Sequence, residues 1–262
     1  EILLPSERSL MVTGGNSIER LNILCRAVSA VRESSPHPCI ILTSNLETEK
    51  ALIGLANSGV IGQLYVCSDC YPEYDVFSGM NRSVIADFFT SVAELRGYRD
   101  SSRLHNYIMA FLKVLEVTIN SPLTLTNIRE FSVQNSDTAI AEHASSLELD
   151  EEYVVLTDPS GGMDFRAILN AVCIAFSSIT TFPCSSGFSV THALTKSSVT
   201  CIRTSTTDPN ILGLYFAALF KSVDSSCFHL FLDDSNLLYT PKFVEEIENL
   251  KKKPGVFLNL FS

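Results

Sequence analysis

The stretch SLMVTGGNSIERLNILCRAVSAV, residues 9–31, decides the fold. It opens with a short apolar run, turns at Gly14 and Gly15, and continues with apolar residues at helical spacing from Leu21 to Val31. A strand, a glycine turn and a helix in this order are typical of the loop that holds phosphates in nucleotide-binding proteins. The same order also occurs as an ordinary turn in any α/β protein, so the stretch alone leaves both interpretations open.

Strands and helices are predicted to alternate on both sides of a helical middle. Short apolar runs at 38–44 and 62–68 flank a helical segment at 45–59. The alternation resumes with strands at 198–204, 227–234 and 256–261 and helices at 208–223 and 240–255. Such alternation predicts an α/β fold with a parallel sheet.

The middle of the chain, residues 81–182, has mostly helical periodicity. We therefore predict one sheet domain built from 1–80 plus 183–262, with an inserted, mainly helical subdomain at 81–182. Within the insertion, 151–158 has strand propensity and stays undecided, and DPSGGMD at 158–164 is predicted to be a loop. The apolar run at 167–182 contains Asn, Ser and Thr, so a buried helix is favoured over a membrane span.

Composition narrows the function classes. Of 262 residues, 46% are hydrophobic, which allows a large core, and 29 acidic residues against 19 basic ones give a net charge of -10. This balance argues against a surface built mainly for nucleic acid, which needs clustered Lys and Arg. Most of the eight cysteines lie in apolar runs, which favours free thiols in a reducing compartment.

The loop after the first strand departs from the phosphate-loop form G-x-x-x-x-G-K-[ST] where chemistry is needed. With Gly14 in the first position, Glu19 replaces the second glycine, Arg20 replaces the lysine and Leu21 replaces the metal-binding hydroxyl. A like charge about 4 Å from a phosphate costs roughly 4 kcal/mol at an effective dielectric of about 20. Binding of ATP in the usual pose is therefore not expected. The candidate residues of this degenerate nucleotide site are Gly14, Gly15, Asn16, Ser17, Arg20 and Leu21.

A second candidate site follows the strand FHLFLDD, residues 228–234. An apolar strand that ends in two acids is where a Walker B carboxylate and its catalytic neighbour lie. Asp233 would hold Mg²⁺ through water, and Asp234 would orient the attacking water. Two acids at a strand end also occur in ordinary loops, and this alternative stays open.

The order of these segments resembles one family. The chain is similar to the cytoplasmic ATPase domain of type IV secretion coupling proteins (the TraG/TraD kind), in the FtsK/HerA group of RecA-like P-loop NTPases. The resemblance rests on YVCSDCYPEYDVFSGMNRSVIADFF (65–89), PLTLTNIREF (122–131) and the segments 198–223 and 230–262. Glu47 matches the family's acidic motif, and Lys253, in a lysine run, stands where the family has an arginine before a late glycine.

The resemblance implies a RecA-like P-loop NTPase sheet with an inserted all-α subdomain whose catalytic positions are replaced. It implies a pseudo-ATPase subunit that recruits or assembles protein partners of a secretion or conjugation machine, such as substrate proteins or active ATPase subunits. The expected location is the cytoplasm, at the inner face of the cell membrane, with no membrane span in this chain and DNA contact undecided. No cofactor and no metal site are expected.

Two alternatives remain. The chain is an active but unorthodox ATP-driven translocation motor, which would need ATP and Mg²⁺ with Arg20 on the phosphates, or it is an unrelated α/β binding protein. The CxxC motif at 67–70 lacks the two further ligands of a structural zinc site, so we interpret it as a coincidence.

Overall fold

The computed structural model describes residues 10–13, 15–68, 76–176, 198–203, 208–222, 227–233 and 240–261. Within these residues six parallel strands form one sheet in the order β1-β6-β5-β2-β4-β3. The strands are β1 (Leu10–Val12), β2 (Cys39–Thr43), β3 (Leu64–Cys67), β4 (Val199–Arg203), β5 (Phe228–Asp233) and β6 (Val256–Phe261). The predicted parallel α/β sheet is confirmed.

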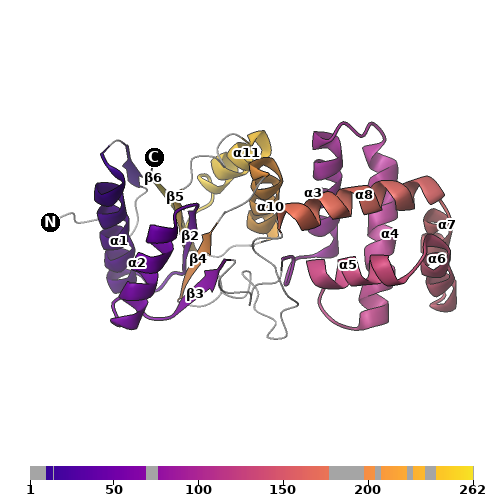
Figure 1. The fold of residues 1–262 in the computed structure, drawn as a ribbon, viewed down its shortest axis with the longest axis horizontal. Coiled ribbons are helices and arrows are strands. Elements are labelled where there is room, and N and C mark those ends of the chain that lie inside the picture. The colour runs from indigo at the N-terminus through magenta and orange to yellow at the C-terminus, as the bar shows by residue number, and fades with distance from the viewer. Residues whose placement is uncertain are drawn as a thin grey trace.

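Helices cover both faces of the sheet (Figure 1). Alternate strand residues such as Ile41 and Phe231 share a core with α1 (Ser17–Ser34) and α2 (Leu46–Asn57). The residues between them, such as Leu42 and Leu232, belong to the core that includes α10 (Pro209–Ser222) and α11 (Pro241–Leu250). Both faces are apolar because a parallel sheet is buried on both sides.

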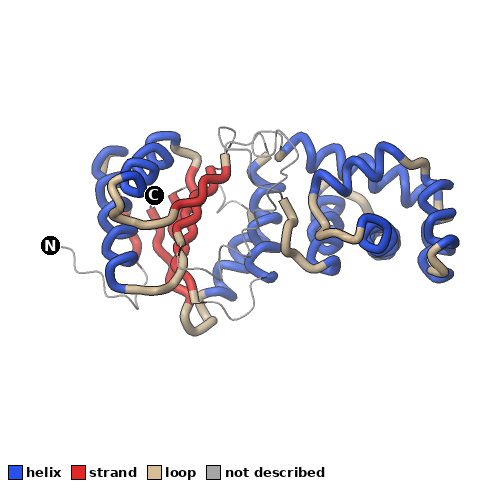
Figure 2. Tube along the Cα trace, turned by 90° about the horizontal axis from the view of Figure 1, so that it is seen from below, coloured by secondary structure: helices blue, strands red, loops and turns tan. Residues whose placement is uncertain are grey.

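The described part of residues 82–176 consists of helices and their connections, and it extends away from the sheet beyond α10 (Figures 1 and 2). Its elements are α3 (Arg82–Leu95), α4 (Ser101–Ile119), α5 (Leu125–Gln134), α6 (Asp137–Ser146), α7 (Asp150–Leu156) and α8 (Pro159–Ala175). None of the helices in the described ranges is both long and apolar enough to cross a bilayer.

Two local expectations are settled by the helices of this part. The undecided segment 151–158 lies mainly in α7, because tertiary packing buries Leu156 and overrides strand propensity. The predicted loop at 158–164 is wrong, since α8 begins at Pro159, with Asp158 accepting a hydrogen bond from the Ser160 amide. The predicted end of the insertion at 182 lies outside the described residues.

Gly161 and Gly162, which made 158–164 look like a loop, are instead packing positions. A Cβ on Gly161 would lie 2.6 Å from Cδ2 of Tyr107 on α4, and one on Gly162 would lie 2.5 Å from Cγ of Asp137 on α6. Helices approach this closely only where a side chain is missing. The two glycines therefore let the start of α8 pack directly against two other helices.

Gly161→Ala is predicted to lower the free energy of unfolding by about 1–3 kcal/mol, because the added methyl must displace the Tyr107 ring. Gly54→Ala on α2 is the matched control, since a Cβ there meets no atom within 4 Å. The control gains up to about 1 kcal/mol from helix propensity. Urea denaturation measures both, and a stabilising Gly161→Ala would contradict the packing role.

His229 on β5 is a buried polar side chain at the amino end of the sheet. Its ring lies 4.6 Å from that of Phe257 between centroids, and its Nδ1 has no hydrogen-bond partner among the described residues. Burial and, to a smaller extent, His37 and Arg32 lower the pKa of His229 from 6.5 to about 4. The imidazole is therefore neutral in the folded protein at physiological pH.

The unfolded chain binds a proton at His229 near pH 6.5, whereas the folded chain binds it only near pH 4. This group therefore contributes stability above pH 6.5 that is lost as the pH falls from 6.5 to 4, by roughly 3 kcal/mol. His229→Phe is predicted to remove that part of the acid destabilisation, and His143→Gln on α6 to leave it in place. Chemical denaturation from pH 7.5 to 4 compares the slopes, and parallel curves for wild type and His229→Phe would refute the assignment.

Candidate functional site

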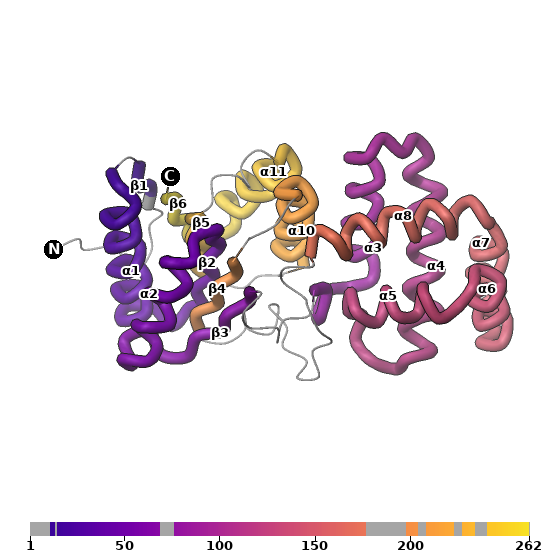
Figure 3. The backbone as a smooth tube through the Cα atoms, viewed as in Figure 1, coloured from indigo at the N-terminus to yellow at the C-terminus, as the bar shows by residue number. Residues whose placement is uncertain are grey.

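Both candidate segments lie at the carboxyl edge of the sheet. β1 leads into Gly15 and α1, and β5 ends at Asp233, with β6 between the two strands (Figure 3). Neighbouring strands lie about 4.8 Å apart, so the two strand ends are separated by roughly 10 Å. The structure brings the two candidate segments to one edge but not to adjacent strands, and Gly14 and Asp234 lie outside the described residues.

The N-terminus of α1 is closed by its own side chains. Oδ1 of Asn16 accepts a hydrogen bond of 2.9 Å from the backbone N–H of Glu19. The backbone N–H of Asn16 in turn donates a hydrogen bond of 3.0 Å to Oε2 of Glu19. This reciprocal pair is a capping box. A Cβ on Gly15 would lie 3.0 Å from the same Glu19 oxygen, so the carboxylate lies over the glycine turn. The positive end of the helix, where a phosphate would bind, already carries a negative group.

A cavity of about 370 Å³ lies beside this helix end. Gly15, Glu19, Arg20 and Arg26 are among its lining residues, whereas Leu21 is half-buried and not among them. Ser17 is the exposed first residue of α1. Leu21 therefore supplies no hydroxyl for a metal ion. An anion that enters the cavity would meet two arginines, Arg20 and Arg26, and the carboxylate of Glu19.

Asp233 is held by two threonines. Its Oδ2 accepts hydrogen bonds of 2.8 Å from Oγ1 of Thr43, at the end of β2, and of 2.8 Å from Oγ1 of Thr48 on α2. Burial, followed by the negative charge of Asp233, raises the pKa of the Cys25 thiol on α1. The carboxylate thus joins β5 to β2 and α2 beneath α1.

β2 and β5 are neighbours whose following helices lie on opposite faces of the sheet (Figure 1). α2 follows β2 on one face, and α11 follows β5 on the other. In open α/β sheets, ligands bind in the crevice that forms at such a point. Here the described part of the crevice holds the hydrogen bonds of Asp233, Thr43 and Thr48.

A buried ion pair lies next to this group. Nε of Arg203, the last residue of β4, lies 2.7 Å from Oε2 of Glu49 on α2, and the side chains are 9% and 3% exposed. Sequence reasoning missed this pair as well as Thr43 and Thr48. The available signal was a polar residue at the end of an otherwise apolar run, as in CIILT and VTCIR.

Two other predicted site residues take no part in this group of hydrogen bonds. Glu47 pairs with Lys50 at 2.9 Å on the exposed side of α2, and the side chains are 65% and 58% exposed. Lys253 precedes β6 and therefore lies at the opposite, amino edge of the sheet. Within the described ranges there is no group of three or more His, Cys, Asp or Glu residues able to hold a metal ion.

No family model matches the chain, and none of the curated proteins matches it.

Glu49→Gln is predicted to lower the free energy of unfolding by about 3 kcal/mol, because it removes the charge that compensates buried Arg203. Glu47→Gln is the matched control on the same helix, and we expect it to cost less than 1 kcal/mol because its pair is exposed. Urea denaturation at pH 7 compares the two. Equal effects would show that the buried pair does not stabilise the edge.

Proposed function

We propose that this chain is a pseudo-ATPase subunit, a RecA-like P-loop domain that has lost nucleotide chemistry and acts by binding proteins. The observation that supports this most directly is the capping box of Asn16 and Glu19 over Gly15. A phosphate loop binds its ligand through backbone N–H groups at the helix N-terminus. In this chain the Glu19 carboxylate accepts such a hydrogen bond itself.

The electrostatics of the helix end support the same conclusion. A triphosphate would bring several negative charges to the position of the Glu19 carboxylate, at a cost of roughly 4 kcal/mol for one charge pair about 4 Å apart. Arg20 has a planar guanidinium, which does not reproduce the compact ammonium of a phosphate-loop lysine. These residues do not fit Mg-ATP in the usual pose.

The bonding of Asp233 points in the same direction. A Walker B aspartate holds Mg²⁺ through water, and Asp233 instead accepts two hydroxyl hydrogen bonds from Thr43 and Thr48. A carboxylate with these partners acts as a structural link between β5, β2 and α2. The proposal therefore assigns Asp233 to stability rather than to catalysis.

The partners we propose follow from the family resemblance. They are proteins of a type IV secretion or conjugation machine, either substrate proteins to be recruited or active ATPase subunits beside which the chain docks. The proposed location is the cytoplasmic side of the inner membrane. The net charge of -10 favours protein over DNA as the bound partner.

Titration calorimetry with Mg-ATP tests the loss of nucleotide chemistry. We expect wild type to give no binding up to millimolar nucleotide and no phosphate release above background, with or without DNA. Micromolar binding that disappears in Asp233→Ala would contradict the proposal. Phosphate release that disappears in Arg20→Ala would instead support an active motor.

A restored variant tests the P-loop part separately. Glu19→Gly, Arg20→Lys and Leu21→Ser together recreate G-x-x-x-x-G-K-S over residues 14–21. We expect this triple variant to gain measurable Mg-ATP binding, and Glu19→Gln, which keeps the capping geometry without the charge, to gain none. Circular dichroism confirms that each variant is folded. A folded triple variant that binds no nucleotide would favour an unrelated α/β protein.

A further inference from the structure

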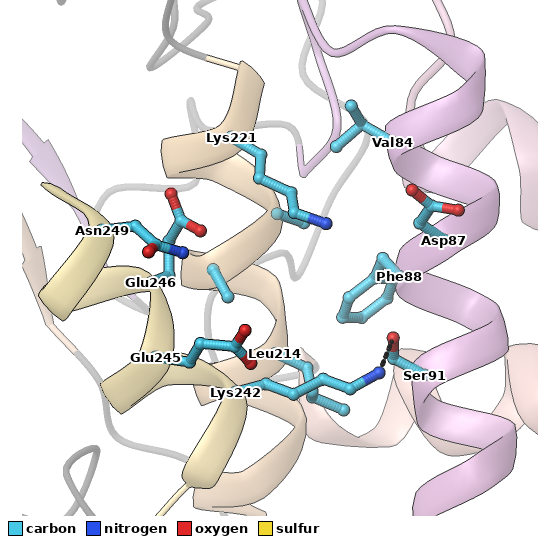
Figure 4. Close-up of a pocket in the computed structure, with 12 residues that line it drawn as sticks. Val84, Asp87, Phe88, Ser91, Leu214, Lys221, Lys242, Glu245, Glu246 and Asn249 are labelled. Carbon is cyan, nitrogen blue, oxygen red and sulfur yellow. Dashed lines mark hydrogen bonds between the residues drawn. The ribbon is translucent and has the colours of Figure 1, made fainter.

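A second cavity, of about 160 Å³, lies between α3, α10 and α11 (Figure 4). Helices α10 and α11 pack on the face of the sheet opposite to α1. Phe88 of α3 and Leu214 of α10 are among its apolar lining residues. Glu245 and Glu246 project toward it from α11, and Lys221 projects into it from α10. The cavity is separate from the N-terminus of α1, on which the proposed function rests. It lies where α3 of the helical part meets α10 and α11 of the sheet part.

Glu246 is the unusual residue of this cavity. The residue as a whole is only 7% exposed, and its carboxylate has no hydrogen bond or ion pair within the described part of the chain, but its oxygens are not fully buried and open into the cavity. Its neighbour along α11, Glu248, is 56% exposed and pairs with Lys251. A buried carboxylate is costly unless it is paired. The arrangement therefore lacks a positive group opposite Glu246.

The lysines of the cavity do not supply that group. Nζ of Lys242 donates a hydrogen bond of 2.7 Å to Oγ of Ser91 on α3 (Figure 4). It also lies 3.2 Å from Oε2 of Glu94 on the same helix, so the charge of Lys242 is paired with Glu94. Lys221 is exposed and does not form an ion pair with Glu246.

The remaining acids make the cavity net negative. Asp87 lies 3.7 Å from Nδ1 of His105, which is positive only when it is protonated, and Glu245 adds a further carboxylate. With Lys242 neutralised by Glu94, three carboxylates (Asp87, Glu245 and Glu246) face one lysine, Lys221. This charge balance selects a cationic ligand.

We propose that the cavity binds a small aliphatic primary amine, with the Glu246 carboxylate as the counter-ion of its ammonium group. The cavity volume of about 160 Å³ is well above the roughly 10–15 Å³ that holds one water, so it has room for a small amine of about four carbons. The alkyl chain packs against Leu214 and Phe88. Because the lining comes from α3, α10 and α11, the bound amine holds the helical part against the sheet part.

Ligand-dependent thermal unfolding of the full chain, together with titration calorimetry, tests the proposal. Butylamine and putrescine at 1–10 mM, at constant ionic strength and pH 7.5, are expected to raise Tm in a concentration-dependent way. Butyrate, which has the same chain length and the opposite charge, is expected to have no effect. No binding of either amine to wild type at 10 mM would overturn the proposal.

Two variants assign binding to this cavity. Glu246→Gln keeps the shape and removes the charge, and we expect it to weaken amine binding at least tenfold while Tm without ligand stays equal or rises. Glu248→Gln, on the same helix but outside the cavity, keeps wild-type affinity.

Ala218→Leu fills the cavity without changing any charge, and we expect it to abolish amine binding. It also keeps the test decisive if Glu246→Gln fails to fold. Amine binding that persists in every folded variant of this pair would place the amine elsewhere and overturn the proposal.

Discussion

The burial of α10 on all sides is the constraint on which the rest of the structure depends. Every residue from Ile211 to Phe220 is buried, so this helix has no solvent face to define an amphipathic stripe. One side covers the sheet, and the other side contacts α3 and α8 through rings such as Tyr215 against Phe88 and Phe176. Gly213 adds a close approach to Thr240, because a Cβ there would lie 2.4 Å from its Oγ1. A single core therefore runs from the sheet into the helical part.

The carboxyl edge of the sheet is stabilised by groups that resemble the parts of a nucleotide site but bond to one another. Glu19 caps α1, Asp233 binds two threonines, and Glu49 neutralises Arg203. In each case a carboxylate is satisfied by this chain's own donors. The edge therefore contributes to stability without a bound phosphate.

Much of the fold could be predicted from the sequence because periodicity and glycine turns are local. The strands CIILT and FHLFLD and the helix after Gly15 need no distant information. The start of α8 could not be predicted, since Gly161 and Gly162 look like a loop until Tyr107 and Asp137 are packed against them. The partners of Asp233 lie 190 and 185 residues away in the chain, so only the sheet order brings them together. The burial of Glu246 could not be predicted either, because an acidic residue on an amphipathic helix is expected to face solvent.

The carboxylates that contribute to stability and the carboxylate proposed to bind a ligand therefore lie on opposite faces of the sheet. The α1 face carries the paired carboxylates, and a ligand there would have to break existing hydrogen bonds. On the α10 face Glu246, whose carboxylate has no partner among the described residues and opens into the cavity, lies where three helices from two parts of the chain meet. A ligand there gains an ion pair without breaking one, and its contacts link α3 to α10 and α11. On electrostatic grounds the cavity between α3, α10 and α11 is thus the better position for a bound cation, and the carboxyl edge of the sheet is a poor position for a bound anion.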